Sequence, residues 1–421
     1  MADIRKYKLA DYIDSFGDGI HGTPNYDENG EYYFINGNNL KNGKIEITSN
    51  TLKITSDEYK RIKRNLRENT LLVSINGTLG NIAFYNNEKI ALGKSACFLN
   101  LNKCACRPFI RYVLESKEFK TYMNRVAGQS TIKNVSPTQV SEYEFFAPSY
   151  SDQARIAKVL STIDRKITIN REINRNLEEL AKQIYDYWFV QFDFPNEEGK
   201  PYKSSGGKMI WNDVLNRKIP DGWEVKKLGE VCNFRNGINY DKKVIGNKSY
   251  KIVNVRNISA SSLFLNQNEF DIISLKSNQA DNYLVSENSI LIARSGCPGA
   301  TRIIMNVDTN VIFCGFIICM ENFHSDYKLY FAYCLKALEN TSATTTGGSI
   351  LQNVSQDTLK RISVIIPPKD IITAYNEKTL AIFKSQLSIQ KEIEELFKLR
   401  DNLLPLLMNG QVTLNSCLSA D

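Results

Sequence analysis

The residue types that carry most enzyme chemistry are sparse in this sequence and do not converge on a site. The chain contains two histidines, His21 and His324, and neither lies in a pattern typical of acid–base or nucleophilic catalysis. Cys104 and Cys106 are separated by a single residue, which is too tight for the usual zinc pair, and no second cysteine pair follows them. We therefore expect surface histidines, no catalytic residue and no metal site.

One short motif could indicate nuclease chemistry. Glu198-Gly199-Lys200 resembles the last half of the acidic-x-Lys motif of nucleases, and Asp193 lies a few residues upstream. The surrounding stretch is rich in Pro, Gly and Ser and has no hairpin signal, so a stand-alone nuclease is only an alternative. The sequence also has no P-loop, no Gly-rich cofactor loop and no Asn-Pro-Pro-aromatic motif. Translocation or adenine methylation would therefore need a partner protein.

Side chains suited to reading DNA are more plentiful, and they occur in polar loops. Arg recognises guanine, Asn or Gln recognises adenine, Ser and Thr contact either, and Lys and backbone amides hold phosphates. Three loops in each half of the chain carry such groups. The candidates for DNA contact are Asn38, Lys41, Asn76, Thr78, Ser130, Thr131 and Lys133 in the first half, and Arg256, Asn257, Arg294, Ser295, Ser349 and Gln352 in the second.

These loops correspond because the chain repeats itself at an offset of about 219 residues. ENTLLVSINGTLG from Glu68 matches ENSILIARSGCPG from Glu287, and STIKNVSPTQV from Ser130 matches SILQNVSQDTL from Ser349. Glycines recur in the first of these loops, and we expect them to serve backbone shape. They are Gly77 and Gly80 in one copy and Gly296 and Gly299 in the other.

The elements expected around the loops are the same in each copy. Short strands and turns come first, a helix follows (108–127 and 327–339), and a strand then ends at Pro148 or Pro367. Each copy continues into a long helix. The predicted organisation is domain 1 at 1–150, a long helix at 151–190, a linker at 191–225, domain 2 at 226–368, a second long helix at 369–410 and a tail at 411–421.

The long helices have a regular apolar period of 3.5 residues, which is typical of a coiled coil. The first seam comprises Ile156, Leu160, Ile163, Ile167, Asn170, Asn174, Leu177, Ala181, Ile184 and Trp188, and the second comprises Ile382, Gln386, Ile389, Ile393, Leu396, Arg400, Leu403 and Leu407. Two such helices, each beside a matching domain, favour pairing with each other. The alternative is that each helix packs only on its own domain.

Composition is compatible with a DNA partner. The chain of 421 residues has a net charge of +7, and the basic surplus lies in two separated blocks, 1–150 and 226–367. No apolar run is long enough for a membrane span or a signal peptide. The nine cysteines are mostly in apolar context, as around Cys314 and Cys319. We therefore expect reduced, buried thiols and a cytoplasmic protein with no membrane partner.

Three stretches resemble the specificity subunits of type I restriction-modification systems. They are FFAPSYSDQARIAKVLSTIDRKI from Phe145, YWFVQFD from Tyr187, and KIPDGWEVKKLGEV from Lys218. The first resembles the start of the family's conserved helical region, with Asp152-Gln153 in place of Glu-Gln. The second copy departs further, because Ile372 and Tyr375 replace the Gln-x-x-Ile step. The order of elements along the whole chain is also that of the family.

The resemblance implies an α+β fold, with two duplicated mixed α/β target-recognition domains separated by a pair of long antiparallel coiled-coil helices. It implies a non-catalytic subunit that reads a bipartite target in double-stranded DNA for defence against foreign DNA. Its partners would be adenine methyltransferase subunits, which use S-adenosylmethionine, and nuclease-translocase restriction subunits, which use ATP and Mg. The alternative from another class is a tandem-domain scaffold that binds proteins and no DNA.

The ends of the two long helices are the expected contact with the methyltransferase subunit. Trp188 and Phe189 end the first seam beside a polar stretch, where large aromatic residues exceed what one helix packing requires. Leu407 and Met408 end the second seam. The alternative is that these side chains pack in the core of the chain itself.

Overall fold

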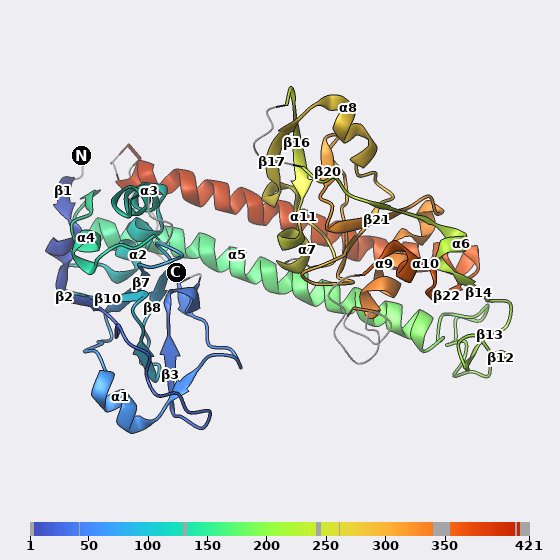
Figure 1. Ribbon diagram of the computed structural model, residues 1–421, viewed down its shortest axis with the longest axis horizontal. Coiled ribbons are helices and arrows are strands. Elements are labelled where there is room, and N and C mark those ends of the chain that lie inside the picture. The colour runs from blue at the N-terminus through green and yellow to red at the C-terminus, as the bar shows by residue number, and fades with distance from the viewer. Residues whose placement is uncertain are drawn as a thin grey trace. The chain divides into compact units, whose positions relative to one another are not determined.

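The structure is a computed structural model in which the chain forms two compact units (Figure 1). It describes residues 4–41, 43–128, 133–240, 246–260, 262–339, 354–408 and 411–412. Unit 1 comprises residues 1–169 together with 392–421, and unit 2 comprises residues 170–391. Each unit therefore contains one copy of the repeat and part of both long helices.

The centre of unit 1 is a four-stranded antiparallel sheet with the strand order β2-β10-β7-β8. Its strands are β2 (Ile13–Asp18), β10 (Ala96–Leu101), β7 (Thr70–Ser74) and β8 (Ile82–Phe84). All residues of β7 and β10 are buried, because both faces of the sheet are covered. Leu71 packs into one hydrophobic core and Leu72 into another, as the alternation of side chains along a strand requires.

Helices cover one face of this sheet and a smaller sheet covers the other. The helices are α2 (Arg107–Glu115) and α3 (Lys117–Val126), and their apolar side chains share a core with Leu71. The smaller sheet has the order β6-β3-β9, in which β3 and β9 are parallel. The other elements of unit 1 before the long helix are β6 (Lys53–Ile54), β3 (Tyr32–Ile35), β9 (Ile90–Leu92), β4 (Leu40–Lys41), β5 (Lys44–Ile45), α1 (Ser56–Ile62), α4 (Pro137–Ser141), β1 (Arg5–Lys8) and β11 (Glu144–Ala147).

Unit 2 repeats this topology, which confirms the predicted duplication. Its four-stranded sheet has the order β15-β21-β18-β19, its three-stranded sheet has the order β17-β16-β20 with β16 and β20 parallel, and β14 pairs with β22 as β1 pairs with β11. The strands are β14 (Glu224–Lys227), β15 (Asn233–Asn236), β16 (Lys248–Val253), β17 (Asp271–Leu275), β18 (Ile290–Ala293), β19 (Thr301–Ile303), β20 (Val311–Phe313), β21 (Ile317–Glu321) and β22 (Ser363–Ile366). The short helices are α6 (Leu228–Val231), α7 (Val255–Ala260), α8 (Ser277–Ala280), α9 (Lys328–Ala337) and α10 (Gln356–Lys360).

Two local elements differ from the sequence prediction. The helix expected at 108–127 is divided into α2 and α3 at Ser116, whose backbone is extended and whose hydroxyl accepts a hydrogen bond from the Phe119 amide to begin a new helix. The linker expected at 191–225 contains a hairpin of β12 (Met209–Asn212) and β13 (Arg217–Pro220). Phe192, Phe194 and Trp223 bury this segment against the core of unit 2, so it is not a solvated tether.

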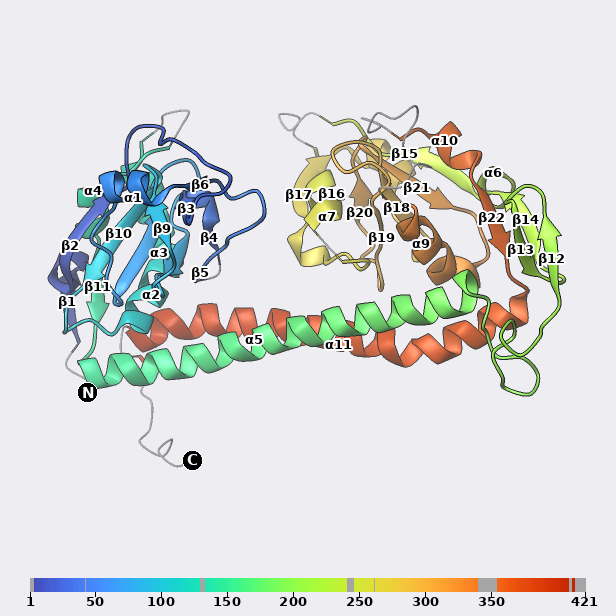
Figure 2. The same ribbon diagram turned by 90° about the horizontal axis from the view of Figure 1, so that it is seen from below.

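The long helices are α5 (Tyr150–Tyr185), which continues into a π-helical turn at Asp186–Val190, and α11 (Lys369–Met408). In unit 1, Asp164 pairs with Arg400 at 2.9 Å and Lys166 pairs with Glu392. In unit 2, the Gln386 amide lies 3.4 Å from the Asn174 carbonyl, and Trp188 contacts Tyr375. The partner numbers fall on one helix as they rise on the other, so within each unit the two segments run antiparallel (Figure 2).

The period of both helices matches their burial. Every residue of the two predicted seams is buried or half-buried. The second helix begins at Lys369, and both Ile372 and Tyr375, which replace the expected motif there, are fully buried. No helix of the described chain combines the length and the apolar character that a membrane span requires.

Candidate nucleic-acid interface

Three loops of unit 1 meet at one end of the four-stranded sheet. Strand β7 ends at Ser74 opposite the first residue of β10. Beyond it, the Gly77 amide donates to the Lys133 carbonyl at 3.0 Å, and the Asn76 side-chain amide donates to Asn134 Oδ1 at 3.2 Å. The structure therefore brings Asn76, Thr78 and Lys133 together, with Thr78 and Lys133 exposed. We name this end of unit 1, formed by residues 36–39, 74–80, 93–96 and 133–135, the unit 1 loop end.

The third loop joins the same surface through Ser95. The Gly37 amide donates to Ser95 Oγ at 2.9 Å, and the Ile75 amide donates to the Ser95 carbonyl at 3.0 Å. This places the exposed Asn38 beside the loop that follows β7. Lys41 is different, because it lies in the β4–β5 hairpin and forms an ion pair with Glu46. Its charge is already balanced within the hairpin, so Lys41 is the weaker candidate.

The recurring glycines of these loops shape the backbone, as we expected from their repetition. Gly77 and Gly80 have φ angles of +73° and +77°, and Gly296 and Gly299 have +79° and +85°. Residues with a Cβ atom are strained at such angles. The glycines therefore shape the same turn in both units.

Unit 2 forms the equivalent loop end from residues 255–257, 293–299, 314–317 and 354. The Arg294 amide donates to the Phe316 carbonyl at 2.8 Å, and the Val354 amide donates to the Arg294 carbonyl at 2.8 Å. A Cβ atom on Gly296 would lie 2.9 Å from Val255 Cγ1, so the start of α7 borders the same loop. Arg294 is exposed and Ser295 is half-buried. We name this surface the unit 2 loop end.

The two candidates on α7 have structural partners. Arg256 is exposed but forms an ion pair with Asp271. Asn257 is buried, its amide donates to the Glu269 carbonyl at 3.1 Å, and its Oδ1 accepts from the Asn254 amide at 2.8 Å. Asn257 therefore holds a turn together and has no surface to offer a base, which corrects its assignment as a DNA contact.

Four candidates lie outside the described residues, and their contact with DNA stays a prediction. They are Ser130, Thr131, Ser349 and Gln352. Two residues at the loop ends were missed from the sequence. Lys94 is exposed in the turn between β9 and β10, and Phe316 is exposed in the equivalent turn between β20 and β21. Phe316 lies within the apolar run VIFCGFIICM, and the only signal that it leaves the core is the preceding Gly315.

A match to a known domain decides the family of this chain. A family model described as the type I restriction modification DNA specificity domain matches residues 1–179 and 220–401. The chain belongs to this family. Each matched stretch contains one copy of the repeat and most of one long helix.

Relatives are similar to this specificity-family chain across both copies. The type I restriction enzyme MjaIX specificity subunit of Methanocaldococcus jannaschii is 26% identical over 396 residues, which cover 93% of this chain and 86% of the relative. The HindI specificity subunit of Haemophilus influenzae is 23% identical over 482 residues, covering 98% and 100%. A crystal structure of the type I restriction-modification S subunit from M. genitalium is 18% identical, with a TM-score of 0.48 over 96% of both chains.

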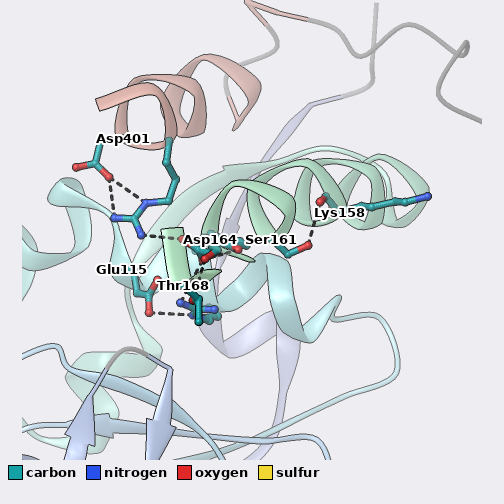
Figure 3. Close-up of polar contacts among 9 residues, drawn as sticks. Glu115, Lys158, Ser161, Asp164, Thr168 and Asp401 are labelled. Carbon is teal, nitrogen blue, oxygen red and sulfur yellow. Dashed lines mark hydrogen bonds and ion pairs between the residues drawn. The ribbon is translucent and has the colours of Figure 1, made fainter. Parts of the chain in front are cut away.

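In this family member, one carboxylate adds polar contacts to the apolar packing between the recognition part of unit 1 and the long helices. Asp164 of α5 accepts from the Tyr112 hydroxyl of α2 at 2.8 Å and pairs with Arg400 of α11 at 2.9 Å (Figure 3). Arg111 of α2 lies 3.4 Å from Asp164 and is also paired with Glu115 at 2.9 Å. All of these groups are largely buried. Burial and the bond to Asp164 raise the pKa of Tyr112 above its ordinary range, so the hydroxyl stays a donor.

Unit 2 uses a different carboxylate for the equivalent attachment. Glu178 of α5 accepts from Lys336 Nζ of α9 at 2.6 Å and from the Leu263 amide at 3.0 Å. The loop end of each unit is thus connected to α5 through the unit's sheet, its covering helix and one buried or half-buried ion pair. These polar contacts and the apolar packing around them join each domain to the helices of its own unit.

The candidates for a methyltransferase contact lie in the hydrophobic cores. Trp188 and Phe189 are 6% and 5% exposed, and the Phe189 ring lies 4.9 Å from that of Tyr375 and 4.8 Å from that of Tyr330. Leu407 and Met408 are likewise buried, in the main core of unit 1. Each helix end closes the core of a unit, which agrees with the alternative of packing within the chain. Their contact with a partner stays a prediction.

Beside Trp188, α5 and α11 leave a groove of about 900 Å³ in unit 2. Its lining includes Leu180 and Tyr187, which are both exposed, together with Ala374 and Lys378 of α11. Val190, which follows Tyr187 at the end of the same helix, is also exposed. These exposed apolar residues around the groove make it a candidate surface for contact with a protein.

The motifs that could have indicated catalysis have structural roles or lie on the surface. Asp193 accepts from the Ser204 amide at 2.7 Å and from its hydroxyl at 2.6 Å, so its carboxylate is committed to a turn. Glu198 and Lys200 are exposed and paired with each other. His21 and His324 are exposed beside Asp18 and Asp326. Within the described ranges, no three potential ligands come together as a metal site.

Proposed function

We propose that this chain is the DNA sequence-specificity subunit of a type I restriction-modification complex and that each unit reads one half of a bipartite target. The observation that carries the proposal is that one topology presents the same loop end twice with different side chains. Unit 1 presents Asn38, Asn76 and Thr78, whereas unit 2 presents Arg294 and Ser295. Amide side chains match adenine and Arg matches guanine. Membership of the specificity family supports the same function.

The chain itself would be non-catalytic, and its partners would supply the chemistry. The proposed partners are adenine methyltransferase subunits, which bring S-adenosylmethionine, and restriction subunits, which bring ATP and Mg. The groove beside Trp188 and the exposed Leu180, Tyr187 and Val190 support a protein contact at this end of α5. Incubation of the purified chain with DNA and Mg tests the nuclease alternative, and we expect no cleavage.

The long helices would act as the spacer of the target. Helix α5 has 36 residues and would be about 54 Å long at 1.5 Å per residue. Paired antiparallel, the helices would hold the loop ends on half-sites about one helical turn apart, with an unread gap of about five to eight base pairs. Inserting one heptad into each helix should lengthen the preferred gap by about three base pairs or abolish binding. An unchanged optimum in a gel-shift series over gap lengths would contradict the spacer.

Binding of the full chain to a randomised duplex library tests the function directly. A DNA reader should enrich one bipartite sequence, and its affinity should fall steeply with salt because bound phosphates release counterions. Each neutralised phosphate contributes about −0.9 to the slope of log affinity against log salt. A protein-binding scaffold would enrich no sequence and would show no such slope. Mapping methylated adenines in cells that carry the complete system then identifies the target in vivo.

A further inference from the structure

The turn between β20 and β21 leaves a large aromatic side chain in solvent. The Ile317 amide donates to the Cys314 carbonyl at 2.9 Å and closes a tight turn with Gly315 and Phe316 at its centre. A Cβ atom on Gly315 would lie 2.0 Å from Asn239 Oδ1, so the backbone is held against its neighbours. Phe316 points outward and is 61% exposed. A phenyl ring in this position contributes little to the core, so it is available for contact with a ligand.

The fold does not require this ring, because unit 1 forms the same turn without it. The Ala96 amide donates to the Gly93 carbonyl at 3.0 Å, with Lys94 and Ser95 at the centre of the turn. Ser95 occupies the position of Phe316, since its carbonyl accepts the equivalent amide of the loop after β7. Its hydroxyl accepts from the Gly37 amide and lies 3.0 Å from Asn36 Oδ1. A small polar residue therefore satisfies the structural needs of this position.

Phe316 lies opposite Arg294, just beyond the paired ends of strands β18 and β21. Strands β18 and β21 pair Ala293 with Ile317, and the hydrogen bond from the Arg294 amide to the Phe316 carbonyl continues this ladder by one residue. Residues that lie opposite each other on paired strands project to the same face of the sheet, and their Cβ atoms are about 5 Å apart. Arg294 and Phe316 therefore project to the face opposite Ala293 and Ile317, and both are exposed because they lie beyond the ends of the strands. Among the described residues, no acidic side chain is found paired with Arg294.

We propose that Phe316 is a specificity-determining residue that contacts the methyl group of a thymine, next to a guanine bound by Arg294. The inference rests on the proposed function and names bases in the half-site of unit 2. Arg binds guanine O6 and N7 in the major groove, and a phenyl ring packs on the C5-methyl group of thymine. Two side chains about 5 Å apart reach base pairs that are adjacent or nearly so, because the rise per base pair is about 3.4 Å.

Base analogues test this proposal without altering the duplex otherwise. The full chain, alone or with its methyltransferase partner, first selects duplexes from a randomised library. Each thymine of the selected half-sites is then replaced by deoxyuridine, which lacks only the methyl group, and each guanine by 7-deazaguanine, which lacks N7. Loss of one buried methyl contact should weaken binding about fourfold at one thymine. Loss of half of the arginine contact should weaken it about tenfold at a neighbouring guanine.

Variants then assign these effects to residues. The Phe316→Ala and Phe316→Ser variants should each bind the thymine and deoxyuridine duplexes equally. Serine is chosen because Ser95 occupies this position in the equivalent turn of unit 1. Arg294→Ala should lose the effect of 7-deazaguanine. Trp211→Ala is the matched control, because Trp211 is another aromatic residue of unit 2, 59% exposed and outside the loop ends, and it should retain both effects. All variants should keep the melting temperature, since the removed side chains are exposed.

The outcomes separate this inference from the proposed function. If the wild-type chain enriches no sequence, the proposed function fails. If a sequence is enriched but no thymine responds to deoxyuridine, or the response persists in both Phe316 variants, the inference is wrong while the function stands. Uniform weakening of every duplex by Phe316→Ala would indicate a backbone contact and would also overturn it. The inference would also be wrong if Phe316→Ala left DNA binding unchanged but weakened co-purification of the methyltransferase.

Discussion

The two units hold a cation at the same place but with different chemistry, half-buried as Arg107 in unit 1 and buried as Lys328 in unit 2. Arg107 begins α2 and donates to the Tyr85 carbonyl at 2.6 Å, whereas Lys328 begins α9 and donates to the Ile304 carbonyl at 2.8 Å. The two carbonyls are one repeat apart, so these are equivalent sites. Arg107 also stacks on Phe84, with its guanidinium 4.5 Å from the ring centre.

The contrast with the loop ends shows where the two units have diverged. At the cation site, a positive charge and its bond to a backbone carbonyl are kept although the residue changes. At the loop ends, the backbone hydrogen bonds and positive-φ glycines are kept, but the side chains differ in size, charge and hydrogen-bonding type. The interior thus preserves the scaffold, and the loop side chains carry the difference between the units. The following predictions test this division, from the largest expected effect to the smallest.

The helix ends should contribute most to stability, because they close the two cores. Phe189→Ala in unit 2 should lower the free energy of unfolding by about 3–5 kcal/mol, and Met408→Ala in unit 1 by about 2–5 kcal/mol. Tyr187→Ala, at a side chain that is 40% exposed in the groove, should change it little while weakening co-purification of a methyltransferase subunit. Urea denaturation measures the first effects. A stable Phe189→Ala protein that loses its partner would instead support a direct contact by Phe189.

The attachment of the recognition part to the helices should depend on Asp164 in unit 1. Asp164→Ala leaves the Tyr112 hydroxyl and two largely buried arginines without their shared acceptor, and should cost about 3 kcal/mol of unfolding free energy. Lys166→Ala breaks the more exposed pair with Glu392 on the same helices and should cost less than about 1 kcal/mol. Calorimetry of both variants measures the difference. Equal losses would mean that burial does not distinguish the two ion pairs.

The buried cation should make the stability of unit 2, but not that of unit 1, depend on mildly alkaline pH. Burial lowers the pKa of Lys328 to about 8 from 10.5, whereas Arg107 remains charged throughout this range. Below pH 8 both folded and unfolded states carry the charged lysine, and its burial penalty is fully present. Between about pH 8 and 10.5 the folded state releases its proton first, so the free energy of unfolding rises with pH.

This rise should total about 3 kcal/mol by pH 10.5, since one pKa unit corresponds to 1.36 kcal/mol, and about 1 kcal/mol of it should be present by pH 9. Lys328→Met should remove it, and Lys328→Arg, which reproduces the residue of unit 1, should also remove it while keeping the bond to the carbonyl. Urea denaturation at pH 7, 8 and 9 measures the change for each protein. The same rise in both variants would assign the pH dependence to another group.

Sequence reasoning recovered the features that are repeated along the chain. The paired segments at a constant offset predicted one topology for both units, and the 3.5-residue period predicted which residues of α5 and α11 are buried. Glycines that recur at equal spacing predicted a role in backbone shape, and the structure gives them positive φ angles. These features depend on local backbone geometry and on periodicity, which a single sequence displays directly.

Other features depend on contacts between distant segments, and these were missed. Asn257 has the residue type of a base reader, but the carbonyl of Glu269 and the amide of Asn254 bury it in a turn. Phe316 has the residue type of a core residue, but Gly315 places it at the corner of a turn. Phe192, Phe194 and Trp223 lie in a stretch whose Pro, Gly and charge favoured a linker. For Asn257 and for the three aromatic residues, partners from other segments of the chain decide burial, whereas for Phe316 a local turn overrides the apolar character of the run around it.

The loop ends should show the smallest effects, confined to one half of the target each. Asn76→Ala should relax recognition only in the half-site of unit 1, and Arg294→Ala only in that of unit 2, each by about 1–3 kcal/mol of discrimination between bases. Lys133→Ala is the control at the same surface, because a phosphate contact carries no sequence information. It should weaken binding to all sequences alike and reduce the salt slope by about 1. Enrichment from a half-randomised library measures each half-site separately. If Asn76→Ala changed base preference in both halves, the two loop ends would not read DNA independently. In that case, exchange of residues 1–150 with those of another family member should alter the whole target instead of one half.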